Sequence, residues 1–120
     1  MSDRAPIGHA LDDEDVKLVT LARTARARNA AAEGAAVRDT TGRTYVATSV
    51  ELASLSLSAL QAAVVAAVSS GADGVEAAAV VTTLPGPRPE DLAVVADLTR
   101  GAPVFIANPD GVAHDVVTAD

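Results

Sequence analysis

The chain has 120 residues, no cysteine and a formal net charge of -7 at pH 7. This length suits one domain with its own core. The acidic balance argues against a nucleic-acid partner, because such a surface needs clustered basic side chains to neutralise phosphates. Without cysteine there is neither a disulfide nor a thiolate metal ligand. No segment has the length and apolar character of a membrane span or a targeting signal, so we expect a cytoplasmic protein with no membrane partner.

Small apolar side chains dominate the composition. The chain holds 27 alanines and 17 valines, against one phenylalanine, one tyrosine and no tryptophan. Each small side chain buries little area, so a lone domain has a modest hydrophobic driving force. Pairing with a second subunit would supply more burial, and a compact monomer is equally compatible with this composition.

Residues 1–10 contain proline, glycine and scattered polar groups, and we expect a flexible leader before a single domain over residues 11–120. The first helix is expected from Asp12 to about Arg28, because acidic residues precede basic ones in the order that the helix dipole favours. This explains both charge clusters without a cation site or an RNA site. The apolar stripe of this helix would consist of Val16, Leu18, Val19, Leu21, Ala22 and Ala25.

Two strands are expected at residues 35–39 and 44–50, joined by a tight turn in which Gly42 supplies a positive φ. Residues 54–58 alternate serine with leucine, as strands do. However, Ser58 and Gln61 form a capping box before an Ala- and Val-rich run. We therefore expect a helix from about Ser58 and interpret the alternating serines as its entry, not as a separate strand.

The remaining elements follow from apolar runs and their boundaries. Residues 75–84 form a continuous small apolar run, which is typical of a strand covered on both faces. Pro89 suits the first position of a helix, which Gly101 would end. Strands are expected at residues 103–107 and 112–117, with a turn between them. The predicted order α-β-β-α-β-α-β-β indicates an α/β fold, a three-layer α/β/α arrangement around a mixed five-stranded sheet.

Two blocks between Glu33 and Leu98 resemble the cytidine deaminase family. Residues 34–37 read Gly-Ala-Ala-Val, residues 41–45 read Thr-Gly-Arg-Thr-Tyr, and residues 49–54 read Ser-Val-Glu-Leu-Ala-Ser. They are similar to the family's run G-A-A-L … D-G … T-G-x-N-V-E-N-A-S-Y. Residues 87–98 are similar to its P-C-G-x-C-R-Q-V-L-A-E-F, with both cysteines replaced. The resemblance implies a cytidine deaminase-like fold, which in the family surrounds a catalytic zinc.

The resemblance also implies that the reactive residues have been replaced. Leu60, Arg88 and Asp91 match the positions of the family's three zinc ligands, and Ala62 matches its proton-shuttling glutamate. Zinc deamination needs three protein ligands and a carboxylate. Leucine cannot coordinate a cation, arginine adds positive charge, and one aspartate cannot hold the metal alone. We therefore expect no zinc, no other cofactor and no deaminase activity.

Substrate-binding positions are altered as well. Ser49 and Glu51 match the family's ribose-binding N-x-E pair, so the acid is kept and the amide is lost. Glu51 is either a vestigial ribose contact or an ordinary polar strand end. The family's segment with a base-stacking phenylalanine is missing before Gly34, and its loss would weaken stacking by about 1–3 kcal/mol. The two histidines, His9 in the leader and His114 in the last strand, lie outside both motif helices and offer no substitute ligands.

The leading expectation is a catalytically inactive cytidine deaminase-like protein that acts through homo-oligomerisation or other protein–protein contacts. Family enzymes assemble as dimers or tetramers through helices around the active site, and the Ala-rich helix expected over residues 59–70 suits close packing. The alternative is a weak nucleoside- or nucleotide-binding module in the vestigial pocket, which Glu51 supports. A third possibility, an active deaminase, requires bound zinc.

Overall fold

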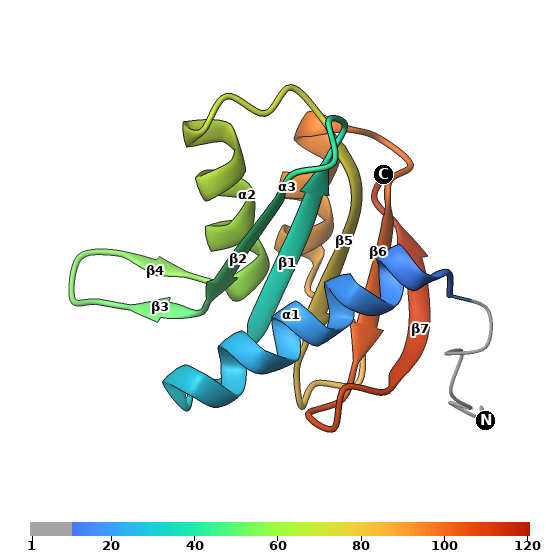
Figure 1. The fold of residues 1–120 in the computed structure, drawn as a ribbon. Helices are drawn as coiled ribbons and strands as arrows, with labels where there is room; N and C mark the ends of the chain where they lie inside the picture. Colours follow the sequence, from blue (N-terminus) through green and yellow to red (C-terminus); the bar gives the residue numbers. More distant parts are fainter. Residues whose placement is uncertain (1–10) are drawn as a thin grey trace.

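A computed structural model describes residues 11–120 of the chain; the expected leader at residues 1–10, including His9, lies outside the described residues. Three helices and seven strands follow one another in this part of the chain (Figure 1). They are α1 (Asp13–Asn29), β1 (Gly34–Asp39), β2 (Thr44–Thr48), β3 (Val50–Glu51), β4 (Ser56–Leu57), α2 (Ala59–Ser69), β5 (Val75–Val81), α3 (Pro89–Leu98), β6 (Pro103–Ala107) and β7 (Ala113–Thr118).

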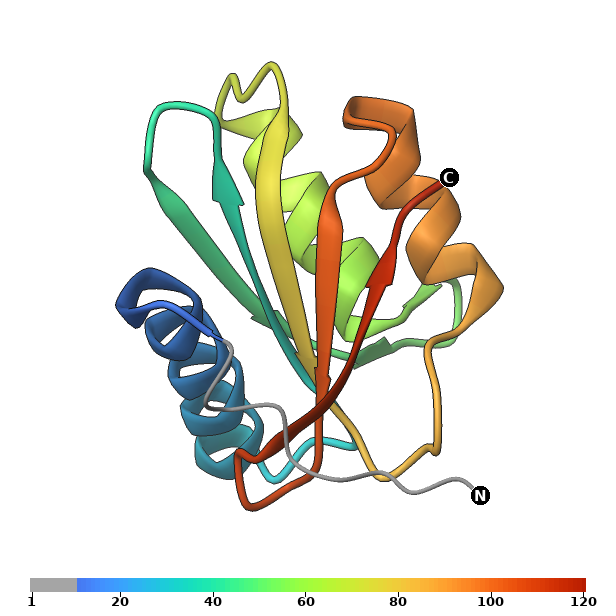
Figure 2. The same cartoon turned by 90° about the vertical axis from the view of Figure 1, so that its right-hand side faces the viewer.

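The main sheet is mixed and five-stranded, with the strand order β2-β1-β5-β6-β7. Only β5 and β6 run parallel; the other neighbouring strands are antiparallel. Helix α1 covers one face, and α2 and α3 cover the other, so that the sheet lies between two helical layers (Figure 2). The α/β class and the three layers expected from the sequence are therefore confirmed. Over the described residues, no helix combines the length and apolar character needed to cross a membrane.

Each face of the sheet has its own core of small apolar side chains. Leu18, Val19 and Ala22 of α1 pack on one face, and Leu60 and Val64 of α2 belong to the cluster on the other. The stripe of α1 is narrower than its periodicity predicted. Val16 and Leu21 are exposed. A helix lying on a flat sheet buries only the side chains that point directly at it.

The three helix starts are confirmed in detail. Asp12 caps α1 by accepting a hydrogen bond from the backbone N–H of Asp15. Ser58 and Gln61 form the expected capping box at α2, with both of its hydrogen bonds present. Pro89 is the first residue of α3. These features depend on residues within one turn of each other, which explains why the sequence predicts them well.

Gly34 is required by a close approach of two backbones. A Cβ atom at this position would collide with the carbonyl oxygen of Ala22 and lie 2.9 Å from the backbone nitrogen of Arg26. The absence of a side chain thus lets α1 lie directly against the first residue of β1. Because Glu33 directly precedes Gly34, the same contact also fixes the backbone position of Glu33.

The interpretation of residues 54–58 as a simple helix entry is wrong. Ser56–Leu57 forms the strand β4, which pairs antiparallel with β3 in a separate two-stranded sheet. The strand expected over residues 44–50 is correspondingly divided, since β2 ends at Thr48. Leu52 and Leu55 exchange backbone hydrogen bonds and close the turn between β3 and β4. The resulting hairpin projects from the body of the domain (Figure 1).

Candidate functional site

A hollow of about 200 Å³ lies where the N-terminal ends of α2 and α3 meet the start of β1. Glu33 before β1 and Glu51 at the end of β3 each contribute a carboxylate, and Ser58 at the cap of α2 contributes a hydroxyl. The start of α3 contributes the guanidinium of Arg88 and the carboxylate of Glu90. The charged and hydroxyl side chains that border it are Glu33, Ser49, Glu51, Ser56, Ser58, Arg88 and Glu90.

Glu33 is a buried carboxylate held at the wall of this hollow. The register pairs Gly34 with Val81, so Glu33 lies opposite Thr82 just beyond the two strands. The Thr82 hydroxyl donates to Glu33 Oε2 over 2.8 Å. Glu33 is only 3% exposed, and its second oxygen, Oε1, is buried and has no hydrogen-bond partner among the described residues.

Arg88 faces the same carboxylate. Its Nε atom lies 3.5 Å from Glu33 Oε2, and its side chain is 40% exposed. This ion pair joins the cap of α3 to the start of β1. The Nε atom nevertheless makes no hydrogen bond, so the pair is held by charge attraction more than by directed bonding.

Asp91 does not border the hollow, but it accepts a hydrogen bond from Ser58, which does. It is 1% exposed, and the Ser58 hydroxyl donates to its Oδ1 atom, which ties the first turn of α3 to the cap of α2. Burial raises the pKa of Asp91 to about 6, against the opposing effect of the Ser58 hydrogen bond. The nearby charge of Glu33 raises this pKa further, and that of Arg88 lowers it.

The structure brings some of the sequence-predicted positions together and separates others. Ser49, Glu51 and Arg88 all border the hollow, and the backbone N–H of Ser49 donates to the carbonyl oxygen of Glu33 over 3.3 Å. Leu60 is fully buried in the core beneath α2, and Ala62 is half-buried on the same helix. Neither of these two borders the hollow.

The residues that the resemblance matches to the family's zinc ligands do not have the chemistry to hold a catalytic zinc. Leu60 has no donor atom, and Arg88 places a cation among the acids. Across residues 11–120, no group of three or more histidine, cysteine, aspartate or glutamate side chains is arranged to hold a metal ion. A catalytic zinc site needs three such protein ligands and an open position for water.

Sequence reasoning missed Glu33 and Thr82. They are 49 positions apart in the chain, and only the antiparallel pairing of β1 with β5 brings them together. The available signal was the isolated acid in the run Ala-Ala-Glu-Gly-Ala-Ala, directly before a buried strand. An acidic residue that directly precedes a buried strand is itself expected to be buried. A buried carboxylate needs a hydrogen-bond or charge partner, so a partner for Glu33 could have been expected.

His114 belongs to a different region. It is half-buried on the edge strand β7 and borders a larger hollow of about 490 Å³ together with Thr82 and Asn108. It does not border the hollow at Glu33.

Comparisons with known proteins agree with this architecture. A family model described as cytidine deaminase-like matches residues 11–111. The fold is similar to cytidine deaminase from Burkholderia pseudomallei, with 26% identity, a TM-score of 0.74 and coverage of 86% of this chain and 91% of that one. Cytidine deaminase from Mycobacterium leprae has the same fold at 23% identity, with a TM-score of 0.67 and coverage of 90% and 95%. A mutant cytidine deaminase from Mycobacterium tuberculosis is 26% identical, with a TM-score of 0.66 and coverage of 82% and 88%. Among curated proteins, none has a significantly similar sequence.

Proposed function

Because the chain belongs to the cytidine deaminase-like family, we propose that it is a catalytically inactive member that acts through homo-oligomerisation or contacts with another protein. The observation that carries the proposal is the set of side chains at the matched positions. Leu60 is sealed in the core, Ala62 offers no carboxylate, and Arg88 is paired with Glu33. Deamination by the family mechanism needs a metal-activated water and a carboxylate to move protons.

The exposed face of α2 supports the part of the proposal that concerns assembly. Helix α2 carries no charged residue, and Val65 and Val68 are each 51% exposed on it. A surface hollow of about 360 Å³ lies along the contact between α2 and α3, bordered by these valines and by Val64, Val94 and Leu98. Contiguous exposed apolar surface of this kind is typical of protein–protein contacts.

Metal content and ammonia release test the loss of catalysis. Protein purified without chelator should contain zinc far below one ion per chain, and it should release no ammonia from cytidine or deoxycytidine. A control variant combining L60C, A62E, R88C and D91C restores the family's residue types at the matched positions. Zinc uptake by this control would show that the measurement detects a working site. Near-stoichiometric zinc or ammonia release with the unaltered chain would disprove the proposal.

The alternative is a weak nucleoside-binding module. It is favoured by Ser49 and Glu51, which lie at the junction of β2 and β3 and both border the hollow. A ligand that binds only the folded state raises the melting temperature. A series with cytidine, deoxycytidine and their nucleotides should therefore shift the melting curve if this alternative holds, and a Glu51→Gln variant should lose the shift. An unchanged melting temperature at millimolar ligand rejects it.

A further inference from the structure

We propose that the hollow beside Glu33 binds a small organic cation, an alkylammonium or guanidinium group, with the Glu33 carboxylate as its anchor. The inference goes beyond the proposed function and does not depend on whether the chain has lost deamination. It rests on one unpartnered buried atom and on the charges that surround it.

The unpartnered atom is Glu33 Oε1. Thr82 orients the carboxylate by donating to the other oxygen, so Oε1 keeps a fixed direction while remaining without a donor. A buried carboxylate oxygen without a hydrogen bond is unfavourable, because it has lost its water without gaining a replacement. A ligand N–H group that reaches this atom would recover a charge-assisted hydrogen bond.

Arg88 does not fill this role. Its Nε atom lies 3.5 Å from Oε2 and makes no hydrogen bond, and Oε1 accepts none from it. Its side chain is partly solvated, which weakens its attraction for Glu33. The guanidinium of Arg88 therefore leaves Oε1 of Glu33 without a hydrogen-bond donor.

The charges around the hollow favour a cation. Glu33, Glu51 and Glu90 border it, and Asp91 lies behind Ser58. Among residues 11–120, Arg88 is the single basic side chain that borders it. Acids gathered in one concave site concentrate positively charged ligands.

The helix starts at the hollow do not reverse this preference. A free helix N-terminus attracts anions because its N–H groups lack acceptors. Here the Ser58 hydroxyl accepts from Gln61 N–H, and the carbonyl oxygen of Arg88 accepts from Asp91 N–H and Leu92 N–H. Each helix start therefore presents fewer free donors than an uncapped one, and Pro89 at the start of α3 has no N–H group to present.

The shape and lining of the hollow indicate an organic cation and not a metal ion. The volume of about 200 Å³ is larger than a bare ion needs, and no cluster of three ligating side chains occurs within residues 11–120. The hydroxyls of Ser49 and Ser56 offer further acceptors at the rim. No aromatic side chain borders the hollow, which favours a compact aliphatic cation over a stacked base.

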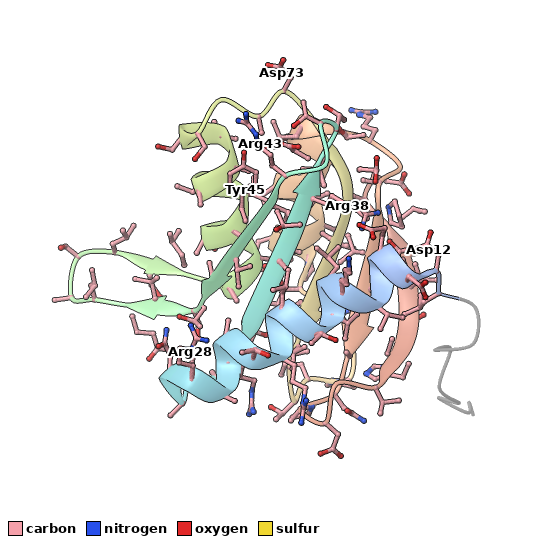
Figure 3. The ribbon with its side chains drawn as sticks, in the orientation of Figure 1. Asp12, Arg28, Arg38, Arg43, Tyr45 and Asp73 are labelled. Carbon is pink, nitrogen blue, oxygen red and sulfur yellow. The ribbon has the colours of Figure 1, made fainter. Side chains whose placement is uncertain are left out.

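Calorimetric titration at low ionic strength tests the inference with methylguanidinium and propylammonium chloride, and with neutral N-methylurea for comparison. Both cations should bind with millimolar affinity, and N-methylurea should not. Glu33→Gln keeps the size of the side chain and an acceptor for Thr82, and it should weaken cation binding about tenfold or more. Asp73→Asn, an exposed acid beyond the opposite end of α2 (Figure 3), should leave binding unchanged.

A second measurement keeps the test decisive if the Glu33→Gln variant fails to fold. Methylguanidinium should shift the backbone amide resonances of Ser49 and Gln61 in ¹⁵N-labelled unaltered protein, and added salt should weaken the effect. The inference is overturned if N-methylurea binds equally well, if a folded Glu33→Gln variant binds unchanged, if the shifts lie elsewhere, or if neither cation binds. Binding of magnesium or zinc in preference to the organic cations also contradicts it. None of these results bears on zinc content or ammonia release, so the two proposals fail separately.

Discussion

Arg38 on β1 and Asp15 on α1 form an ion pair of 2.9 Å across the interface between the sheet and the helix. The same guanidinium lies 2.5 Å from Glu76 on β5 and donates to the carbonyl oxygen of Glu14 over 3.2 Å. One largely buried cation thus joins three elements. It holds α1 on the face of the sheet opposite α2 and α3.

Replacing Arg38 by alanine should lower the free energy of unfolding by about 2–3 kcal/mol, because it leaves the half-buried Asp15 without its cation. Urea denaturation followed by far-UV circular dichroism measures the loss. Lys17→Ala is the matched control, since it removes an exposed ion pair with Glu14 of 3.5 Å and should cost at most about 0.5 kcal/mol. Equal losses in the two variants would contradict the structural role of Arg38.

Gly34→Ala should be strongly destabilising, by about 2 kcal/mol or more. The added methyl group would meet the backbone of Ala22 and Arg26, and a helix backbone cannot move aside as a flexible side chain can. Gly86→Ala is the control, because a Cβ atom there meets nothing within 4 Å. Its unfolding free energy should stay within about 0.5 kcal/mol of the unaltered protein. A mild effect at Gly34 would mean that α1 does not approach β1 this closely.

Asp91 should make the protein less stable as the pH rises from about 4 to 6. Its pKa is about 6 in the folded protein, above the value near 3.9 of an aspartate in an unfolded chain. Between these values the folded state keeps a proton that the unfolded state releases, so rising pH favours unfolding. The stability present below pH 4 is lost as the pH passes 6.

An Asp91→Asn variant isolates this effect, because an amide does not ionise. The difference between the unfolding free energies of the variant and of the unaltered protein should change in favour of the variant as the pH rises from about 4 to 6. The change should reach up to about 3 kcal/mol. Urea denaturation at a series of pH values gives this difference. Asp97→Asn, an exposed acid on the same helix, should show no such pH dependence. A difference for Asp91→Asn that stays constant with pH would contradict the raised pKa.

Assembly should depend on the exposed face of α2. If α2 forms the contact, a Val65→Asp and Val68→Asp double variant should be monomeric where the unaltered protein is oligomeric, since two buried charges in an interface are unfavourable. Light scattering over a range of protein concentrations measures the molar mass. Val116→Asp, at an exposed valine on β7, should leave assembly unchanged. An unaltered protein that is monomeric at every concentration would remove the support for homo-oligomerisation.

Local residue patterns were sufficient to predict most of the fold. Asp12, Ser58 and Pro89 cap or begin helices through bonds and angles within a single turn, and they do so in the structure as expected. The continuous apolar run at β5 likewise indicated a strand covered on both faces, which lies in the middle of the sheet. Such features depend on near neighbours, so the chain alone specifies them.

Tertiary structure decided the rest. The exposure of Val16 and Leu21 depends on how α1 lies on the sheet, and the pairing of β3 with β4 depends on a hairpin turn that serine–leucine alternation does not specify. In the candidate site, the sequence by itself determined which residues stand at the positions that the resemblance matches to the family's zinc ligands. Only the tertiary structure decided that Glu33 would lie buried between Thr82 and Arg88. Strand pairing brings together residues that are distant in the chain, and a local sequence pattern does not specify which distant residues will meet.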